Sequence, residues 1–229
     1  MRVKFGDLKK LMLENSSFIR ENNIDEILEN LKNELVVRGF DLNNLDLQFG
    51  ETSFNFIGEE IVIRITFIRY SNYDFLTDYV KNSDSILKPN YEKKIGNTGA
   101  AVLELKRLDT LGITDFDITD TYIKLRNDGY LPFDLKPDNF GRDVDGKVYL
   151  LDYGELIFIK NRPLYLQKLD LESHANRCFE YDNIYKRYLK RQEKKKTNTT
   201  QEKISFLTRL KNSLLNSKNK NDDIDSKKR

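Results

Sequence analysis

The hydrophobic spacing of this chain changes near residue 45 from a helical to an alternating period, and this change restricts the fold more than any other feature. Before it, apolar residues recur on one helix face behind the capping residue Asn23: Ile24, Ile27, Leu28, Leu31 and Leu35. After it, residues 45–69 alternate apolar and polar side chains around a turn at Gly58-Glu59, as about three half-buried strands would. A mostly helical segment over residues 1–44, followed by a meander, predicts an α+β fold.

Weaker patterns follow the meander. They predict short helices over 73–81 and 119–127, a loop over 83–98, strands over 100–105, 147–151 and 156–160, a turn at Asp145-Gly146, and helices over 164–171 and 181–189. A polar run over 190–203 contains no apolar residue, so the folded body should end near Leu189. The expected sections are a helical extension (1–44), a β-rich lobe (45–107), a short second lobe (108–190) and a basic tail (191–229).

Single copies of two reactive residue types exclude several classes of protein. The only cysteine, Cys178, rules out an intramolecular disulfide and a thiolate-clustered zinc site, and it favours a reducing compartment. The only histidine, His174, rules out zinc-protease motifs and most histidine-based triads. Neither has a suitable partner nearby in the sequence, so both are interpreted as ordinary packing or surface residues.

The charge is uneven along the chain, although the total is only +2. From Lys186 onward there are 15 basic and 5 acidic residues, against 24 basic and 32 acidic residues before it. No signal peptide is read at the N-terminus and no stretch reaches the roughly 18 apolar residues of a membrane span, so a cytoplasmic protein is expected.

The residues that point to chemistry are Asp134, Lys136 and Asn139 in the string DLKPDN and Asp152 in the string DYG, 18 positions after Asp134. A carboxylate can orient a hydroxyl, a cation can meet a phosphate, and a carboxamide with a second carboxylate can bind a divalent ion. Such oxygen ligands favour Mg²⁺ or Mn²⁺. The alternative is two polar turns of a surface hairpin, since turns use the same residue types.

These strings resemble the H-R-D-x-K-x-x-N and D-F-G motifs of the protein kinase superfamily. The resemblance implies a kinase-like two-lobed fold with a reduced C-lobe, binding of ATP with Mg²⁺ or Mn²⁺, and phosphorylation of a protein or of the chain itself. It makes Asp134 the catalytic base, Lys136 a residue that steadies the γ-phosphate, and Asn139 and Asp152 the metal ligands. Lysine two positions after the aspartate is more similar to Ser/Thr kinases than to Tyr kinases.

The chain also departs from the family pattern. Pro132 and Phe133 stand where the pattern has His and Arg, and no A-P-E motif follows Gly154. Regulation through a phosphorylated activation loop is therefore not expected. A pseudokinase that serves as an ATP-binding scaffold, and a phosphotransferase similar to aminoglycoside or choline kinases, remain open as alternatives.

The expected nucleotide-binding strand contains Arg64 in the string IVIR, where the family has V-A-I-K. Arg64 is thus a candidate for contacting the ATP phosphates, although a strand arginine that extends into solvent is as good an interpretation. Lys4 and Lys106 are other candidates for this cation, and Glu92 is a candidate for its partner. The string FGETSF around Gly50 resembles a reduced glycine-rich loop, IGNTGAAV is interpreted as a turn and a strand, and residues 106–110 as the hinge between the lobes.

The basic tail has three interpretations. It is a solvated linker with a disordered end, or a basic amphipathic helix over 203–215 that docks on an acidic partner or an anionic membrane, or a contact for nucleic acid through Lys194, Lys195 and Lys196. Nucleic acid is the least favoured partner; it would make the chain an adaptor with a decayed catalytic lobe.

Overall fold

The structure is a computed structural model that describes residues 1–50, 52–67, 76–152 and 155–195. The chain divides into two compact units, Met1–Cys178 and Phe179–Arg229. In the second unit a helix runs over 179–195, so the helix expected to end at Leu189 continues into the polar run. The predicted amphipathic helix over 203–215 lies outside the described residues. None of the helices within the described ranges is long and apolar enough to cross a membrane.

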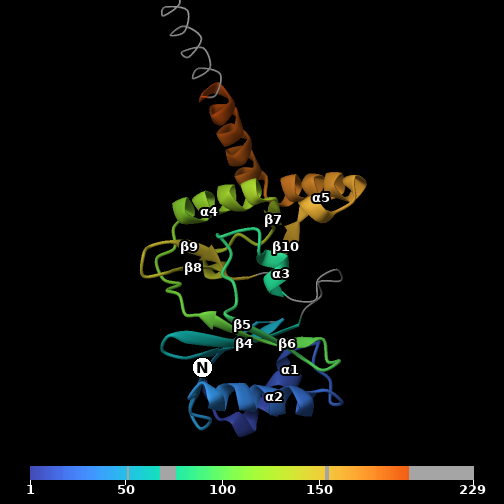
Figure 1. Ribbon diagram of the computed structural model, residues 1–229, viewed down its shortest axis with the longest axis vertical. Helices are drawn as coiled ribbons and strands as arrows, with labels where there is room; N and C mark the ends of the chain where they lie inside the picture. The colour runs from blue at the N-terminus through green and yellow to red at the C-terminus, as the bar shows by residue number, and fades with distance from the viewer. Residues whose placement is uncertain (51, 68–75, 153–154, 196–229) are drawn as a thin grey trace, which may run out of the picture. The chain divides into compact units, whose positions relative to one another are not determined.

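A six-stranded antiparallel sheet organises the first unit, with strand order β1-β2-β3-β4-β6-β5. Figure 1 labels its strands β4, β5 and β6. Its strands are β1 (Arg2–Val3), β2 (Leu45–Phe49), β3 (Ser53–Ile57), β4 (Ile61–Phe67), β5 (Tyr91–Ile95) and β6 (Ala100–Lys106). The predicted meander is confirmed as β2, β3 and β4, although its last two residues, 68–69, lie outside the described residues. The predicted strand over 100–105 is confirmed as β6. The predicted loop over 83–98 is wrong in its second half, which forms the edge strand β5 along β6.

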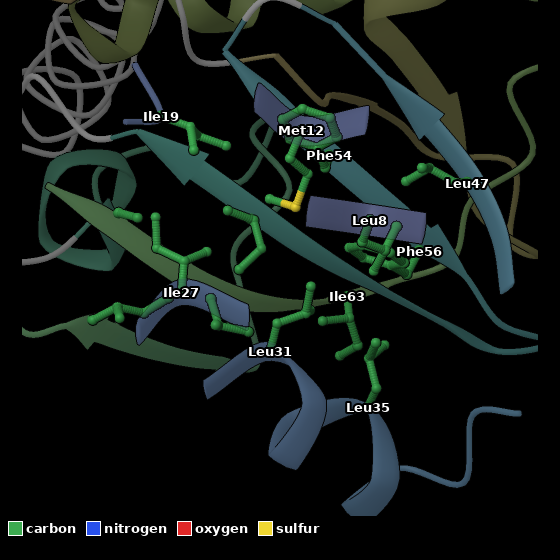
Figure 2. Packing of buried hydrophobic residues seen from close by; sticks show 14 of the residues in the cluster. Leu8, Met12, Ile19, Ile27, Leu31, Leu35, Leu47, Phe54, Phe56 and Ile63 are labelled. Atoms are coloured by element: carbon green, nitrogen blue, oxygen red, sulfur yellow. The ribbon is translucent and has the colours of Figure 1, made fainter. Parts of the chain in front are cut away.

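Two helices cover one face of the sheet and share its hydrophobic core. These are α1 (Leu8–Asn15) and α2 (Ile24–Val37), and Leu8, Met12, Leu31 and Leu35 are fully buried against alternate residues of the strands (Figure 2). Burying each such side chain contributes about 1.5–3 kcal/mol. The expected N-terminal extension therefore packs into the β-rich part, and its first residues are the strand β1 rather than helix.

Alternation along the strands leaves the second face of the sheet for the site. On β3 and β4 the buried residues Phe54, Phe56, Ile63 and Ile65 point to the helices, which turns Asn55 and Arg64 to the opposite face. There the two residues lie directly across from each other in the register.

The other described elements of the first unit are short, as follows: the 3₁₀ helix η1 (Phe5–Asp7), α3 (Leu76–Val80), α4 (Asp115–Asp128), β7 (Tyr130–Pro132), the 3₁₀ helix η2 (Pro137–Asn139), β8 (Phe140–Arg142), β9 (Val148–Leu150), β10 (Leu156–Phe158), the 3₁₀ helix η3 (Ile159–Asn161) and α5 (Leu164–Arg177). The predicted helix over 73–81 corresponds to α3, and residues 73–75 lie outside the described residues. The α4 helix begins earlier than predicted because Thr114 and Asp117 form a capping box at its start.

Two small antiparallel ribbons carry the candidate residues. β7 pairs with β10, and β8 pairs with β9 around the predicted Asp145-Gly146 turn, where Gly146 has φ +83°. Asp134 follows β7 by two residues, and Asp152 lies between β9 and β10. The ribbons thus fix both ends of the segment that contains DLKPDN and DYG.

Candidate active site

A cavity of about 730 Å³ lies within the first unit, against the open face of the sheet. The sheet contributes Asn55, Val62 and Arg64, and the end of β6 with the segment after it contributes residues 106–111. The third wall consists of Asp138, Asn139, Leu151 and Asp152. The volume is within the range of small-molecule and cofactor sites, and one end of the cavity carries the polar residues that the sequence singled out.

The DLKPDN loop is held by hydrogen bonds from Asn139. Its main-chain N–H donates to the Lys136 carbonyl at 3.0 Å, and its side-chain amide donates to the Asp134 carbonyl at 3.0 Å. Pro137 at the first position of η2 fits this turn because proline needs no N–H partner there. The side-chain nitrogen of Asn139 therefore stabilises the loop, and its carboxamide oxygen is the atom that could bind a ligand.

Asp152 is fixed next to this loop by the main chain. The N–H of Leu151 donates to the Asn139 carbonyl at 2.8 Å, and both Asn139 and Asp152 line the cavity. No group of three His, Cys, Asp or Glu side chains placed to hold a metal ion occurs in the described ranges. This pair of oxygen donors suits Mg²⁺, which commonly takes one or two protein ligands and completes its shell with substrate phosphates and water.

Asp134 and Lys136 form an ion pair at 2.9 Å. The hydrogen bond to Asp134 raises the pKa of Lys136, and the charges of Glu155 and Asp152 act in the same direction. Lys136 stays 71% exposed, so its ammonium can contact Asp134 and still meet an anion. Neither residue lines the cavity itself, but Asp134 lies beside it because its carbonyl accepts a hydrogen bond from Asn139, which does line the cavity.

Arg64 is bonded into the site rather than extended into solvent. Its Nε donates to Asn55 Oδ1 at 2.6 Å, and one terminal nitrogen donates to the Leu151 carbonyl at 2.8 Å. Its guanidinium therefore links the sheet to Leu151, the residue immediately before Asp152. Of the other candidate cations, Lys106 at the end of β6 lines the cavity and Lys4 does not. Glu92 is on the same face of the sheet as Arg64, and Leu103 of β6 lies between them in the register.

The segment over 106–110 connects β6 to the region before α4, where the sequence analysis expects a hinge. Asp109 exchanges two main-chain hydrogen bonds with Arg142, at 2.9 and 2.7 Å. The main-chain N–H of Leu108 donates no hydrogen bond within the described ranges. An N–H of this kind at a cavity wall can recognise a planar ring nitrogen of a ligand.

Among the cavity residues that were not predicted from the sequence, Asn55 and Asp138 lie next to predicted site residues. Asn55 holds Arg64, and the signal for it was its place directly across from Arg64 in an alternating meander. Asp138 lies inside DLKPDN and lines the cavity beside Asn139. It was passed over because a Pro-Asp pair is ordinary turn composition.

No protein-family model and no curated protein matches this chain. Solved structures with some similarity to this chain include three structures of WbdD, a bifunctional kinase-methyltransferase. The medium-resolution structure is 12% identical with a TM-score of 0.32, and it covers 50% of this chain and 32% of that chain. The high-resolution structure is 14% identical with a TM-score of 0.35, and the match covers 53% of this chain and 34% of the WbdD chain. The co-crystal structure with the kinase inhibitor LY294002 is 12% identical with a TM-score of 0.33, and the match covers 55% of this chain and 36% of the WbdD chain.

The chain spans about a third of the length of these structures. The mixed helix and sheet content agrees with the expected α+β class.

Proposed function

We propose that this chain is an ATP-dependent phosphotransferase that moves the γ-phosphate of Mg-ATP to a Ser or Thr hydroxyl, on itself or on another protein. Asn139 and Asp152 would bind Mg²⁺, which neutralises phosphate charge. Asp134 would orient the acceptor hydroxyl and take its proton, while Lys136 would stabilise the negative charge of the transferred group. Arg64 would face the phosphates from the sheet.

One observation carries this proposal. The hydrogen bonds from Asn139 to the Asp134 carbonyl and from Leu151 to the Asn139 carbonyl hold a carboxylate and a lysine beside a cavity that two candidate metal ligands, Asn139 and Asp152, line. Phosphoryl transfer needs positioning and charge neutralisation more than covalent chemistry by the protein, and these four side chains supply both. The apolar residues Val62, Leu105 and Leu151 line the cavity as well and suit a planar base.

A small-molecule acceptor is the second candidate, and the short path from Asp152 to β10 favours it. Only residues 153–155 separate Asp152 from the strand that pairs with β7. This leaves little chain for docking a peptide, so an alcohol of a metabolite or antibiotic would be the acceptor in that case.

The test is incubation of the purified protein with γ-labelled ATP and Mg²⁺, with and without a generic protein acceptor, next to the variant Asp134→Ala. Label on protein that disappears in the variant is the expected result. If no protein is labelled while nucleotide still binds, a screen of non-peptide alcohols separates the second candidate from a pseudokinase. Absence of both binding and transfer would reject the proposal.

A further inference from the structure

The single histidine is fully buried directly behind the DLKPDN loop, although nothing in the sequence links it to that loop. His174 lies near the end of α5, and its Nε2 is 3.0 Å from the carbonyl oxygen of Pro132. Its ring stacks on Tyr122 and meets the ring of Phe133 edge-on at 5.0 Å. Pro132 and Phe133 are the two residues immediately before Asp134.

The partners of the ring determine its protonation. A guanidinium nitrogen of Arg126 is 3.2 Å from Nδ1, and arginine has no acceptor atom, so Nδ1 must accept. A carbonyl oxygen can only accept, so Nε2 carries the proton and donates to Pro132. Both contacts require the same neutral tautomer, and Arg126 thereby sets the donor that faces the loop.

Other residues of the same helix end act on the same two loop residues. The guanidinium of Arg177 lies over the Phe133 ring, 4.9 Å from its centroid, and also pairs with Glu155. The Cys178 thiol lies 3.7 Å from the Pro132 carbonyl oxygen. On the other side, the Phe133 N–H donates to the Glu155 carbonyl at 2.9 Å. The chain entering Asp134 is thus held between α5 and the start of β10.

We propose that His174 is a positioning residue for the phosphoryl-transfer site: as the Nε2–H tautomer set by Arg126, it fixes the Pro132–Phe133 segment and thereby the placement of Asp134. The effect of His174 on activity rests on the proposed function, whereas its fixing of the Pro132–Phe133 segment does not. A base displaced by a fraction of an ångström loses rate without losing nucleotide affinity, because Asp134 is outside the cavity that would take the nucleotide.

The first test reads the tautomer directly. Because the chain contains one histidine, the imidazole resonances of ¹⁵N-labelled full-length protein belong to His174 without further assignment. The expected spectrum shows a protonated Nε2 and an unprotonated Nδ1 at neutral pH. A proton on Nδ1, or a ring in fast tautomer exchange, would overturn the proposal.

The second test compares His174→Leu, which removes the donor, with His174→Gln, whose Nε2 can donate from a similar position. Leu31→Ala, in the core on the opposite face of the sheet, is the control for lost stability alone. The amide of Phe133 should exchange with deuterium faster in His174→Leu than in the other two variants. Equal exchange in His174→Leu and Leu31→Ala would overturn the positioning role.

The third readout is turnover, where His174→Leu should lower kcat by roughly tenfold to a hundredfold and leave the KM for ATP within about twofold. His174→Gln should restore most of kcat. A fall in kcat that Gln does not rescue, or a matching fall in Leu31→Ala, would contradict the proposal. If the wild-type protein transfers no phosphate at all, the proposed function fails, while the tautomer and the exchange rates still decide the role of His174.

Discussion

At the scale of residues, Arg64 joins the sheet to the DYG segment through two different nitrogens of one guanidinium. A lysine keeps the charge but offers one compact ammonium, which cannot reach Asn55 and Leu151 with the same geometry. Arg64→Lys should therefore lower the free energy of unfolding by about 1 kcal/mol, the net worth of one such hydrogen bond. Urea unfolding measures this.

The matched control is Arg107→Lys, because Arg107 is exposed and its side chain donates one hydrogen bond, to the Gly58 carbonyl. Its unfolding free energy should change by less than about 0.5 kcal/mol. Equal changes in the two variants would mean that Arg64 does not link the two segments.

Gly141 shows a second constraint at the same scale. A Cβ atom there would lie 2.8 Å from Leu108 Cβ and 3.1 Å from Leu151 Cδ1, so an alanine must displace one of these two residues of the cavity wall. We expect Gly141→Ala to cost about 1–3 kcal/mol and to weaken nucleotide binding. Gly6→Ala, whose added Cβ meets nothing within 4 Å, should leave both unchanged in thermal unfolding and nucleotide titration.

At the scale of elements, a buried ionic group ties α2 to the sheet. Arg38, just after α2, donates to Glu34 at 2.5 Å and to Glu104 of β6 at 2.6 Å, and Lys93 of β5 donates to Glu34 at 3.3 Å. Burial raises the pKa of Glu34, but hydrogen bonds from Arg38 and Lys93 outweigh it and hold the pKa below its ordinary value.

A carboxylate with a depressed pKa in the folded state stabilises the fold above its unfolded pKa, and this contribution is lost as the pH falls. The thermal midpoint should therefore drop as the pH is lowered from about 5 to about 3, and less steeply in Glu34→Gln, which is already destabilised at neutral pH. Glu29→Gln, an exposed change on the same helix, should keep the wild-type slope. Parallel slopes in all three proteins would show that Glu34 does not carry this effect.

Elements with a clear periodic pattern of apolar side chains could be predicted from the sequence. Elements that form because of contacts with neighbouring elements could not. The meander over 45–69 alternates clearly, so β2, β3 and β4 were predicted. The charged string YEKKI forms β5 because the main chain of β6 offers an edge and Glu34 engages Tyr91 and Lys93. Likewise, DLKPDN and DYG pointed to a shared site, but the hydrogen bonds of Arg64 and the packing of His174 depend on contacts across the fold.

At the scale of the whole molecule, the proposed phosphoryl transfer depends on whether Asp134 acts as the base in the intact chain. The direct measurement is steady-state phosphoryl transfer from Mg-ATP by Asp134→Asn, which preserves the shape of the side chain and removes the base. Asp145→Asn, in the exposed β8–β9 turn, is the matched control. We expect kcat of Asp134→Asn to fall by about 10²–10⁴-fold with little change in the KM for ATP, while Asp145→Asn matches the wild type. Full turnover by Asp134→Asn would contradict the assignment of the site.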